Sequence, residues 1–422
     1  MELLATAFFI DSLSVYRNLK KDPVIQCLYR CIINLYTTKS IKEQLKAVQN
    51  YTKMCRLLYE SEFRGCLSDY IFDLVLHDIN IFSLSCAKNQ LKGLDGHIIA
   101  AAKHDLKTLC NLSILSERQL KSAFKNKFVH NKDLIDLLPS YSISHKKYLA
   151  QGDWSENIQS VADFYLENGV GDFAKFHAFI YSPQTGLQPV ADLDKIQLRE
   201  LFLYEKQRQA VIDNIKALLA GMPYHHILLY GDRGTGKSST IKAIANTYAN
   251  RKLRIVELSS AHLMHLGDLL KILGNLPLKF IVYIDDLSFE ESDTSYNILK
   301  AALEGSVNTC PSNTVICATS NRRHLVKETF SSRAGDSLHL ADTIDDYTAL
   351  SERFGLIITF MKPSKDNYLK IVNALAKERH LPQNEQTLFK GAEQYALEKG
   401  TRSPRIAKQY INSLETNALL ET

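Results

Sequence analysis

A glycine-rich segment at residues 231–238, Gly-Asp-Arg-Gly-Thr-Gly-Lys-Ser, holds the residue types and spacing best suited to chemistry. It fits the pattern Gly-x-x-x-x-Gly-Lys-Ser/Thr, follows an apolar run at 227–230 and precedes a helical run at 240–249. Glycines allow backbone N–H groups to turn toward phosphate oxygens, and the start of the following helix adds partial positive charge. The segment therefore predicts a phosphate-binding loop between a strand and a helix.

Two side chains at the end of this segment have distinct expected roles. Lys237 is expected to reach the β- and γ-phosphates of ATP, and the hydroxyl of Ser238 is expected to ligate Mg²⁺. ATP and Mg²⁺ are accordingly the predicted cofactors. The predicted nucleotide contacts are the whole segment and the residue after it, namely Gly231, Asp232, Arg233, Gly234, Thr235, Gly236, Lys237, Ser238 and Ser239.

Two adjacent carboxylates, Asp285 and Asp286, follow a second apolar run at residues 280–284. Mg²⁺ needs a further hard oxygen ligand, usually an Asp at the end of a neighbouring strand, so Asp285 is the predicted metal-side carboxylate. Asp286 is placed to orient or deprotonate an attacking water. The two acids could instead cap the following helix, an alternative that the upstream phosphate-binding loop disfavours.

Short β-rich runs alternate with helical runs through the region that carries these motifs, which predicts a parallel sheet covered by helices on both faces. Apolar residues spaced three and four apart indicate helices up to about residue 178, and pure helix returns from about residue 364. The predicted fold class is α/β, with a small helical C-terminal subdomain and an all-α N-terminal domain. The β-rich runs lie at residues 227–230, 254–258, 280–284, 315–318 and 357–360.

The length of the chain indicates more than one domain, because 422 residues exceed what a single core usually supports. Residues 181–189 concentrate proline, glycine and polar side chains, as an interdomain linker does. We therefore predict an all-α N-terminal domain at 1–180, a linker at 181–195, a nucleotide-binding α/β domain at 196–362 and a helical lid at 363–422.

The composition is that of an ordinary globular protein, with 45% hydrophobic and 23% charged residues. No apolar run reaches the roughly 18 residues that a membrane span requires. Glu2 stands where a secretory signal needs positive charge, so we expect a cytoplasmic protein without a membrane partner. The eight cysteines lack the spacing of a disulfide framework or a metal site, so we expect reduced thiols and no structural metal.

Positive charge is concentrated near the N-terminus. Residues 1–150 hold 21 Lys and Arg against 14 Asp and Glu, a balance of +7, which leaves −2 for the remainder because the net charge is +5. This excess permits an acidic partner such as nucleic acid or an acidic protein. A solvated, lysine-rich helical face accounts for it equally without a partner and is the simpler interpretation.

The order of the motifs resembles that of AAA+ ATPases. Ala-Thr-Ser-Asn at 318–321 resembles their sensor 1 motif, which assigns Asn321 as a polar residue near the γ-phosphate. Leu-Ser-Glu-Arg-Phe-Gly at 350–355 resembles the box that carries the arginine finger, which assigns Arg353 to the nucleotide of a neighbouring subunit. The resemblance thus implies self-association into a ring or a helical oligomer.

A third likeness lies at residues 400–407, Gly-Thr-Arg-Ser-Pro-Arg-Ile-Ala, which resemble the sensor 2 motif of the same class. In this resemblance Ser403 caps a helix, Pro404 occupies its first turn, and Arg405 is directed at the phosphates. Arg402 is the alternative to Arg405.

The stretch from about residue 195 to 415 also resembles a narrower bacterial AAA+ group, known as domain of unknown function 815. That likeness rests on residues 230–239, 285–290 and 318–325. The second acid of the strand-end pair is usually Glu in AAA+ proteins, and Asp286 is one methylene shorter. Glu290 could act as the base instead, or hydrolysis could be slow.

Two functions remain open at this point. The first is an oligomeric ATPase that couples ATP hydrolysis to the remodelling or loading of a macromolecule, a protein or a nucleic acid. The second is a nucleotide-controlled binding module with slow turnover, whose helical N-terminal domain engages the partner. A small-molecule kinase is disfavoured, because a kinase needs neither a sensor 2 arginine nor a finger.

Overall fold

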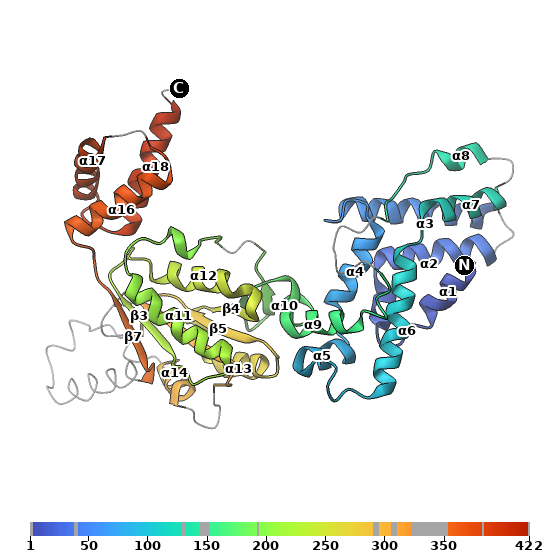
Figure 1. Cartoon of the computed structure of the whole chain (residues 1–422), viewed down its shortest axis with the longest axis horizontal. Helices are drawn as coiled ribbons and strands as arrows, with labels where there is room; N and C mark the ends of the chain where they lie inside the picture. Colours follow the sequence, from blue (N-terminus) through green and yellow to red (C-terminus); the bar gives the residue numbers. More distant parts are fainter. Residues whose placement is uncertain are drawn as a thin grey trace. The chain divides into compact units, whose positions relative to one another are not determined.

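The computed structural model of the chain describes residues 3–37, 41–128, 132–143, 152–191, 194–289, 295–304, 310–321, 353–381 and 384–420. It divides into two compact units, Met1–Lys175 and Phe176–Thr422. Figure 1 shows the first unit in blue to green and the second in green to red.

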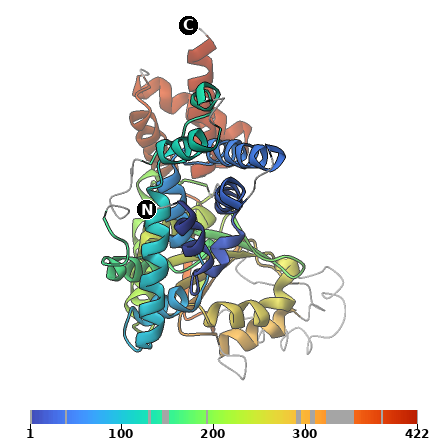
Figure 2. The same cartoon turned by 90° about the vertical axis from the view of Figure 1, so that its right-hand side faces the viewer.

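The first unit is built from helices around a single apolar core, as predicted. Trp154 is the largest of its fully buried side chains and packs on Phe72, with 4.9 Å between the ring centroids. Two helices begin with a capping box, Asn80 with Ser83 and Ser116 with Gln119. Figure 1 labels the helices of this unit, and Figure 2 shows the same cartoon turned by 90°. The helices are α1 (Leu3–Asp11), α2 (Pro23–Thr37), α3 (Ile41–Glu60), α4 (Leu67–His77), α5 (Ile81–Asn89), α6 (Gly96–Ser113), α7 (Glu117–Lys127), α8 (Lys132–Asp136), α9 (Ile158–Asn168) and α10 (Asp172–Lys175).

Among the residues that the structure describes, no single helix combines the length and the apolar character needed to cross a membrane. The bent pair α4 and α5 meets the length and composition test only when the two helices are taken together.

The second unit contains one seven-stranded sheet with the order β2-β1-β4-β5-β6-β3-β7. All neighbouring strands run parallel except β1 and β2. The central strands β5 and β6 are buried along almost their whole length, which is why they appear as continuous apolar runs. The strands are β1 (Ala178–Ser182), β2 (Gly186–Pro189), β3 (Ile227–Gly231), β4 (Leu253–Leu258), β5 (Lys279–Ile284), β6 (Thr314–Ser320) and β7 (Leu356–Phe360).

The predicted linker at residues 181–195 is wrong over its first half. Residues 178–189 form an antiparallel hairpin, in which Tyr181 pairs with Leu187, and strand β1 continues the sheet by pairing with β4. The glycine and polar residues at 183–186 therefore make a hairpin turn, and their composition alone does not separate a turn from a linker. The first unit accordingly ends at Lys175 instead of residue 180.

Helices cover the sheet and continue beyond it. The flanking helices are α11 (Glu205–Ala220), α12 (Lys237–Tyr248), α13 (Leu266–Gly274) and α14 (Ser295–Glu304). The last three, α16 (Lys365–Glu378), α17 (Glu385–Glu398) and α18 (Pro404–Leu420), gather as a separate cluster, drawn in red in Figure 1, around their own apolar core. The predicted fold class is confirmed: a mostly parallel sheet flanked by helices with a small helical C-terminal subdomain, together with an all-α N-terminal unit.

Candidate nucleotide site

The glycine-rich segment forms the turn between β3 and α12, as predicted. Gly231, Gly234 and Gly236 all have positive φ angles, of 132°, 76° and 98°. A Cβ at Gly231 would lie 2.2 Å from the carbonyl oxygen of Phe360, so only glycine fits at the point where the loop leaves the sheet. The loop is thereby held against the end of β7.

Lys237 is buried at the start of α12 with its amine enclosed by the loop. Its Nζ donates to the carbonyl oxygens of Gly231 at 2.8 Å and Asp232 at 2.9 Å, and to Oδ1 of Asn321 at 3.0 Å. Burial lowers the pKa of this amine, and the nearby carboxylates of Asp232, Asp286 and Asp285, which raise it, only partly offset this effect. The ammonium group of Lys237 is thus surrounded by oxygen acceptors. Phosphate oxygens accept hydrogen bonds from an ammonium group in the same way and could replace them.

The predicted metal side chains lie together. The hydroxyl of Ser238 donates to Oδ1 of Asp285 at 2.9 Å, and the hydroxyl of Thr319 donates to the same oxygen at 2.5 Å. Burial alone would raise the pKa of Asp285, but the hydrogen bonds from Thr319 and other neighbours outweigh it and hold the pKa below its usual value. An ionised carboxylate beside a hydroxyl is a hard-oxygen set that fits Mg²⁺, and Ser238 and Asp285 are the residues that would hold the ion.

Asp286 lies at the centre of the site in an unusual backbone conformation. Its φ is +50°, a region in which Asp is tolerated better than most residues. Its backbone N–H donates to Oγ1 of Thr319 at 3.0 Å, and its Oδ1 accepts from Nδ2 of Asn321 at 2.5 Å. Asn321 therefore joins Lys237 to Asp286 in one hydrogen-bonded chain.

Thr319 was not singled out by the sequence, although it contacts both acids. Strands β5 and β6 pair in parallel with Ile284 opposite Ala318, so the next residues, Asp285 and Thr319, meet at the carboxyl edge of the sheet. Its position could have indicated this role, because Thr319 lies two residues before Asn321 at the end of the strand next to that of the two acids.

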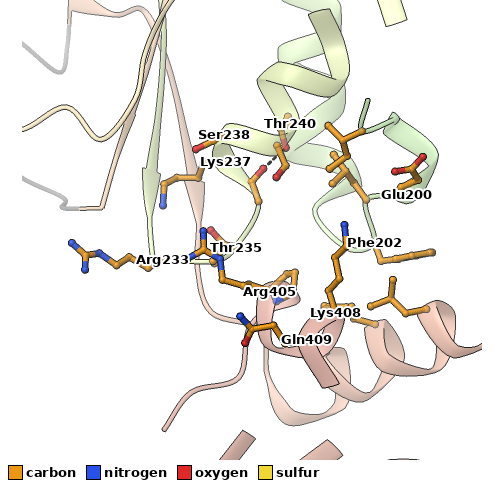
Figure 3. Close-up of a pocket in the computed structure, with 18 of the residues that line it drawn as sticks. Glu200, Phe202, Arg233, Thr235, Lys237, Ser238, Thr240, Arg405, Lys408 and Gln409 are labelled. Carbon is orange, nitrogen blue, oxygen red and sulfur yellow. Dashed lines mark hydrogen bonds between the residues drawn. The ribbon is translucent and has the colours of Figure 1, made fainter. Parts of the chain in front are cut away.

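A cavity of about 840 Å³ opens in front of the loop, a volume typical of pockets for molecules of nucleotide size. Figure 3 shows the loop on one side of it and the side chains of α18 on the other. The contributing residues of α18 are spaced three, four and seven residues apart, and so share one helix face. They are Arg405, Lys408, Gln409 and Asn412, and Pro404 at the start of the helix lines the cavity too.

Of the two arginines considered for sensor 2, Arg405 lines the cavity and Arg402 does not. The backbone N–H of Arg405 donates to the carbonyl oxygen of Gly234 at 3.2 Å, which brings the start of α18 onto the loop. Arg402 instead forms two hydrogen bonds with Glu393, of 3.1 and 2.9 Å. The hydrogen bond from Arg402 also lowers the pKa of the Glu393 carboxyl. The cap predicted for this helix is present, since Ser403 accepts from the backbone of Ile406.

The remaining predicted residues divide into those that line the cavity and those that do not. Asp232 turns toward the sheet, where its Oδ2 accepts from the backbone of Lys362 at 2.8 Å, and Gly231 does not line the cavity either. Arg233 lines the cavity but is exposed, and Ser239 lines it too. Arg353 lies just before β7, is half-buried, and does not line the cavity of its own chain. Glu290 lies outside the described residues.

The chain is similar to proteins of known structure and to one protein family. Among solved structures, three variants of RuvB from Thermotoga maritima are similar at TM-scores of 0.34, 0.33 and 0.32 with 13%, 16% and 16% identity. The matches cover 52%, 52% and 51% of this chain and 72%, 72% and 71% of those chains. No curated protein matches the chain. Residues 174–418 match the family described as "Protein of unknown function (DUF815)", and since this is more than half of the chain, the protein belongs to that family.

Proposed function

We propose that this protein is a Mg²⁺-dependent ATPase of the AAA+ class. The observation that carries the proposal is the chain of hydrogen bonds from Lys237 through Asn321 to Asp286, beside the Ser238 and Asp285 pair. It places a cation, an amide and a carboxylate at one end of a nucleotide-sized cavity. When bound, Mg²⁺ supplies positive charge to the phosphate oxygens of ATP.

Each residue then has a defined task. The ammonium of Lys237 holds the terminal phosphates, and the carboxylate of Asp286 accepts the proton of the attacking water. The amide of Asn321 contacts both groups and orients them relative to each other. Arg405, on α18, adds positive charge from the other side of the cavity.

We further propose that the protein self-associates and acts on a macromolecule. Arg353 does not line the cavity of its own chain, as expected of an arginine that completes a neighbour's site. The helical first unit and its excess of basic residues are the proposed contact with a protein or nucleic-acid partner.

The experiment is a phosphate-release assay with Mg²⁺ or with EDTA, paired with sizing of the protein with and without ATP. The proposal expects Mg²⁺-dependent release and a larger species in ATP, and Arg353→Ala should retain ATP binding but lose most of its hydrolysis. Release that is indifferent to Mg²⁺ would refute the ATPase. Full activity of Arg353→Ala would refute completion by a neighbour.

A slow nucleotide switch is the second candidate, and one observation favours it. Asp286 is shorter than the usual glutamate, and Asn321 already occupies its Oδ1. Turnover below about one per minute, unchanged by DNA, RNA or unfolded protein, would select the switch over the motor. Stimulation by one of these additions would select the motor and identify its class of partner.

A further inference from the structure

Two consecutive residues, Leu203 and Tyr204, adopt left-handed backbone conformations with φ of 67° and 66°. Side chains other than glycine, asparagine and aspartate rarely adopt this region, and two large ones in succession require strong tertiary contacts to hold them. The turn directly precedes α11, and the residues just before it line the nucleotide cavity. The contacts that hold this turn therefore shape one wall of the cavity.

Arg208 supplies the first contact. Its side chain is only 8% exposed and itself lines the cavity, and its guanidinium donates to the carbonyl oxygen of Leu203 and, at 3.4 Å, to Oε1 of Glu205. A planar guanidinium makes these two bonds at once in a fixed geometry, whereas a lysine amine has no such fork. Arg208 thus links the Leu203–Tyr204 turn to the first helical turn of α11.

Tyr204 supplies the second contact, to the end of β7. Its hydroxyl donates to the carbonyl oxygen of Met361 at 2.5 Å, and its ring packs on Phe360 with 5.0 Å between centroids. Phe360 also accepts the backbone N–H of Asp232 at 3.0 Å. The turn and the phosphate-binding loop therefore both contact Phe360, the last residue of β7.

The segment that leads into the turn is pinned at its other end as well. Nδ2 of Asn246, on α12, donates to the carbonyl oxygens of Asp194 at 2.9 Å and Ile196 at 3.0 Å. Between this point and the turn, the cavity is lined by Ile196, Glu200, Leu201 and Phe202. Figure 3 shows Glu200 and Phe202 across from the glycine-rich loop, on the side of the cavity where Lys408 enters.

This wall differs chemically from the phosphate end. It offers apolar and aromatic side chains next to the charged Glu200 and Arg208. Helix α16 adds the apolar Ile371 and Leu375, with Glu378 and Arg379 at its end. A flat, weakly polar group such as a nucleobase fits such a wall, whereas a triphosphate fits the loop. The remaining part of the cavity is thus suited to the base of the same nucleotide.

We infer that Arg208 is a positioning residue that fixes the Leu203–Tyr204 turn and thereby sets the affinity of the cavity for the nucleobase, without contributing to the binding of the phosphates. The inference rests on the proposed function, since it assumes a nucleotide in this cavity. It assigns a task to a buried arginine that no phosphate-binding motif contains.

The test compares ATP with inorganic tripolyphosphate, both with Mg²⁺, by titration calorimetry on the full chain. Arg208→Met keeps an unbranched apolar stem and removes both hydrogen bonds, and Arg208→Lys keeps the charge but not the fork. In both variants ATP should bind about tenfold more weakly while tripolyphosphate binds as before. Equal losses for the two ligands, or no loss for either, would overturn the inference.

A second pair of variants tests the turn without touching Arg208. Leu203→Gly and Leu203→Val both remove the leucine side chain, but glycine favours a left-handed backbone and valine opposes it. ATP should bind more weakly to Leu203→Val than to Leu203→Gly, with tripolyphosphate unaffected. The reverse order, or identical affinities, would contradict a role for the turn.

The outcome for the unaltered protein separates this inference from the proposed function. Binding of neither ligand would refute the proposed nucleotide site itself. Binding of both ligands with the same affinity would leave the phosphate site standing and refute a base-binding wall.

Discussion

The two ends of the nucleotide cavity are built in different ways. At the proposed phosphate end, polar side chains are joined by hydrogen bonds: Asn321 links Lys237 to Asp286, and Ser238 donates to Asp285. At the opposite end the wall is a short segment whose shape depends on the left-handed turn at Leu203–Tyr204. One cavity thus combines an end defined by residue type with an end defined by backbone shape.

The largest expected effect is at the phosphate end. Replacing the buried amine in Lys237→Ala should weaken both ATP and tripolyphosphate by about a hundredfold or more, because charge-assisted bonds to phosphate are lost. Lys242→Ala is the matched control, since Lys242 lies on the same helix but does not line the cavity. Calorimetric titration measures both variants. A loss confined to ATP would erase the proposed division between the two ends.

The two arginines of the C-terminal subdomain should differ. Arg405→Ala should lower the rate of ATP hydrolysis by about tenfold or more, because Arg405 lines the cavity and lies on the loop. Arg402→Ala should leave the rate within about twofold of the unaltered protein, because Arg402 does not line the cavity and is held in a partly exposed ion pair with Glu393. Steady-state phosphate release gives both values, and the opposite ranking would transfer the sensor 2 assignment to Arg402.

The smallest expected effect is on the pH dependence of binding. Burial lowers the pKa of Lys237, and phosphate binds its protonated form, so tripolyphosphate affinity should fall as pH rises and begin to fall below the usual lysine range. In Lys237→Arg the guanidinium stays charged, and any affinity that remains should not show this decline. Titrations from neutral to alkaline pH test this. A profile shared by both proteins would assign the titration to another group.

Much of the phosphate end could be predicted from the sequence, because phosphate and Mg²⁺ restrict which residue types can serve. Lys237, Ser238 and Asp285 lie where the glycine-rich pattern and the strand-end acids placed them. Thr319 could have been found from the same logic, since it also lies at the carboxyl end of a central strand.

The opposite end could not be predicted, for a physical reason. Leu203 and Tyr204 have no intrinsic preference for a left-handed backbone, so only the tertiary contacts of Arg208 and Tyr204 reveal the turn. The β1–β2 hairpin was missed because turn residues resemble linker residues until the pairing of Tyr181 with β4 is known. Part of the polar face of α18 could have been predicted, since Lys408 follows Arg405 by three residues and therefore shares its side of the helix.

The proposed role of Asp286 as the base is tested by single-turnover hydrolysis of ATP with Mg²⁺ in the unaltered protein and in Asp286→Asn, with ATP binding measured in parallel. Both proteins should bind ATP, and the variant should hydrolyse it at least about a hundredfold more slowly, since an amide accepts a proton poorly. Equal rates in the two proteins would show that Asp286 is not the base.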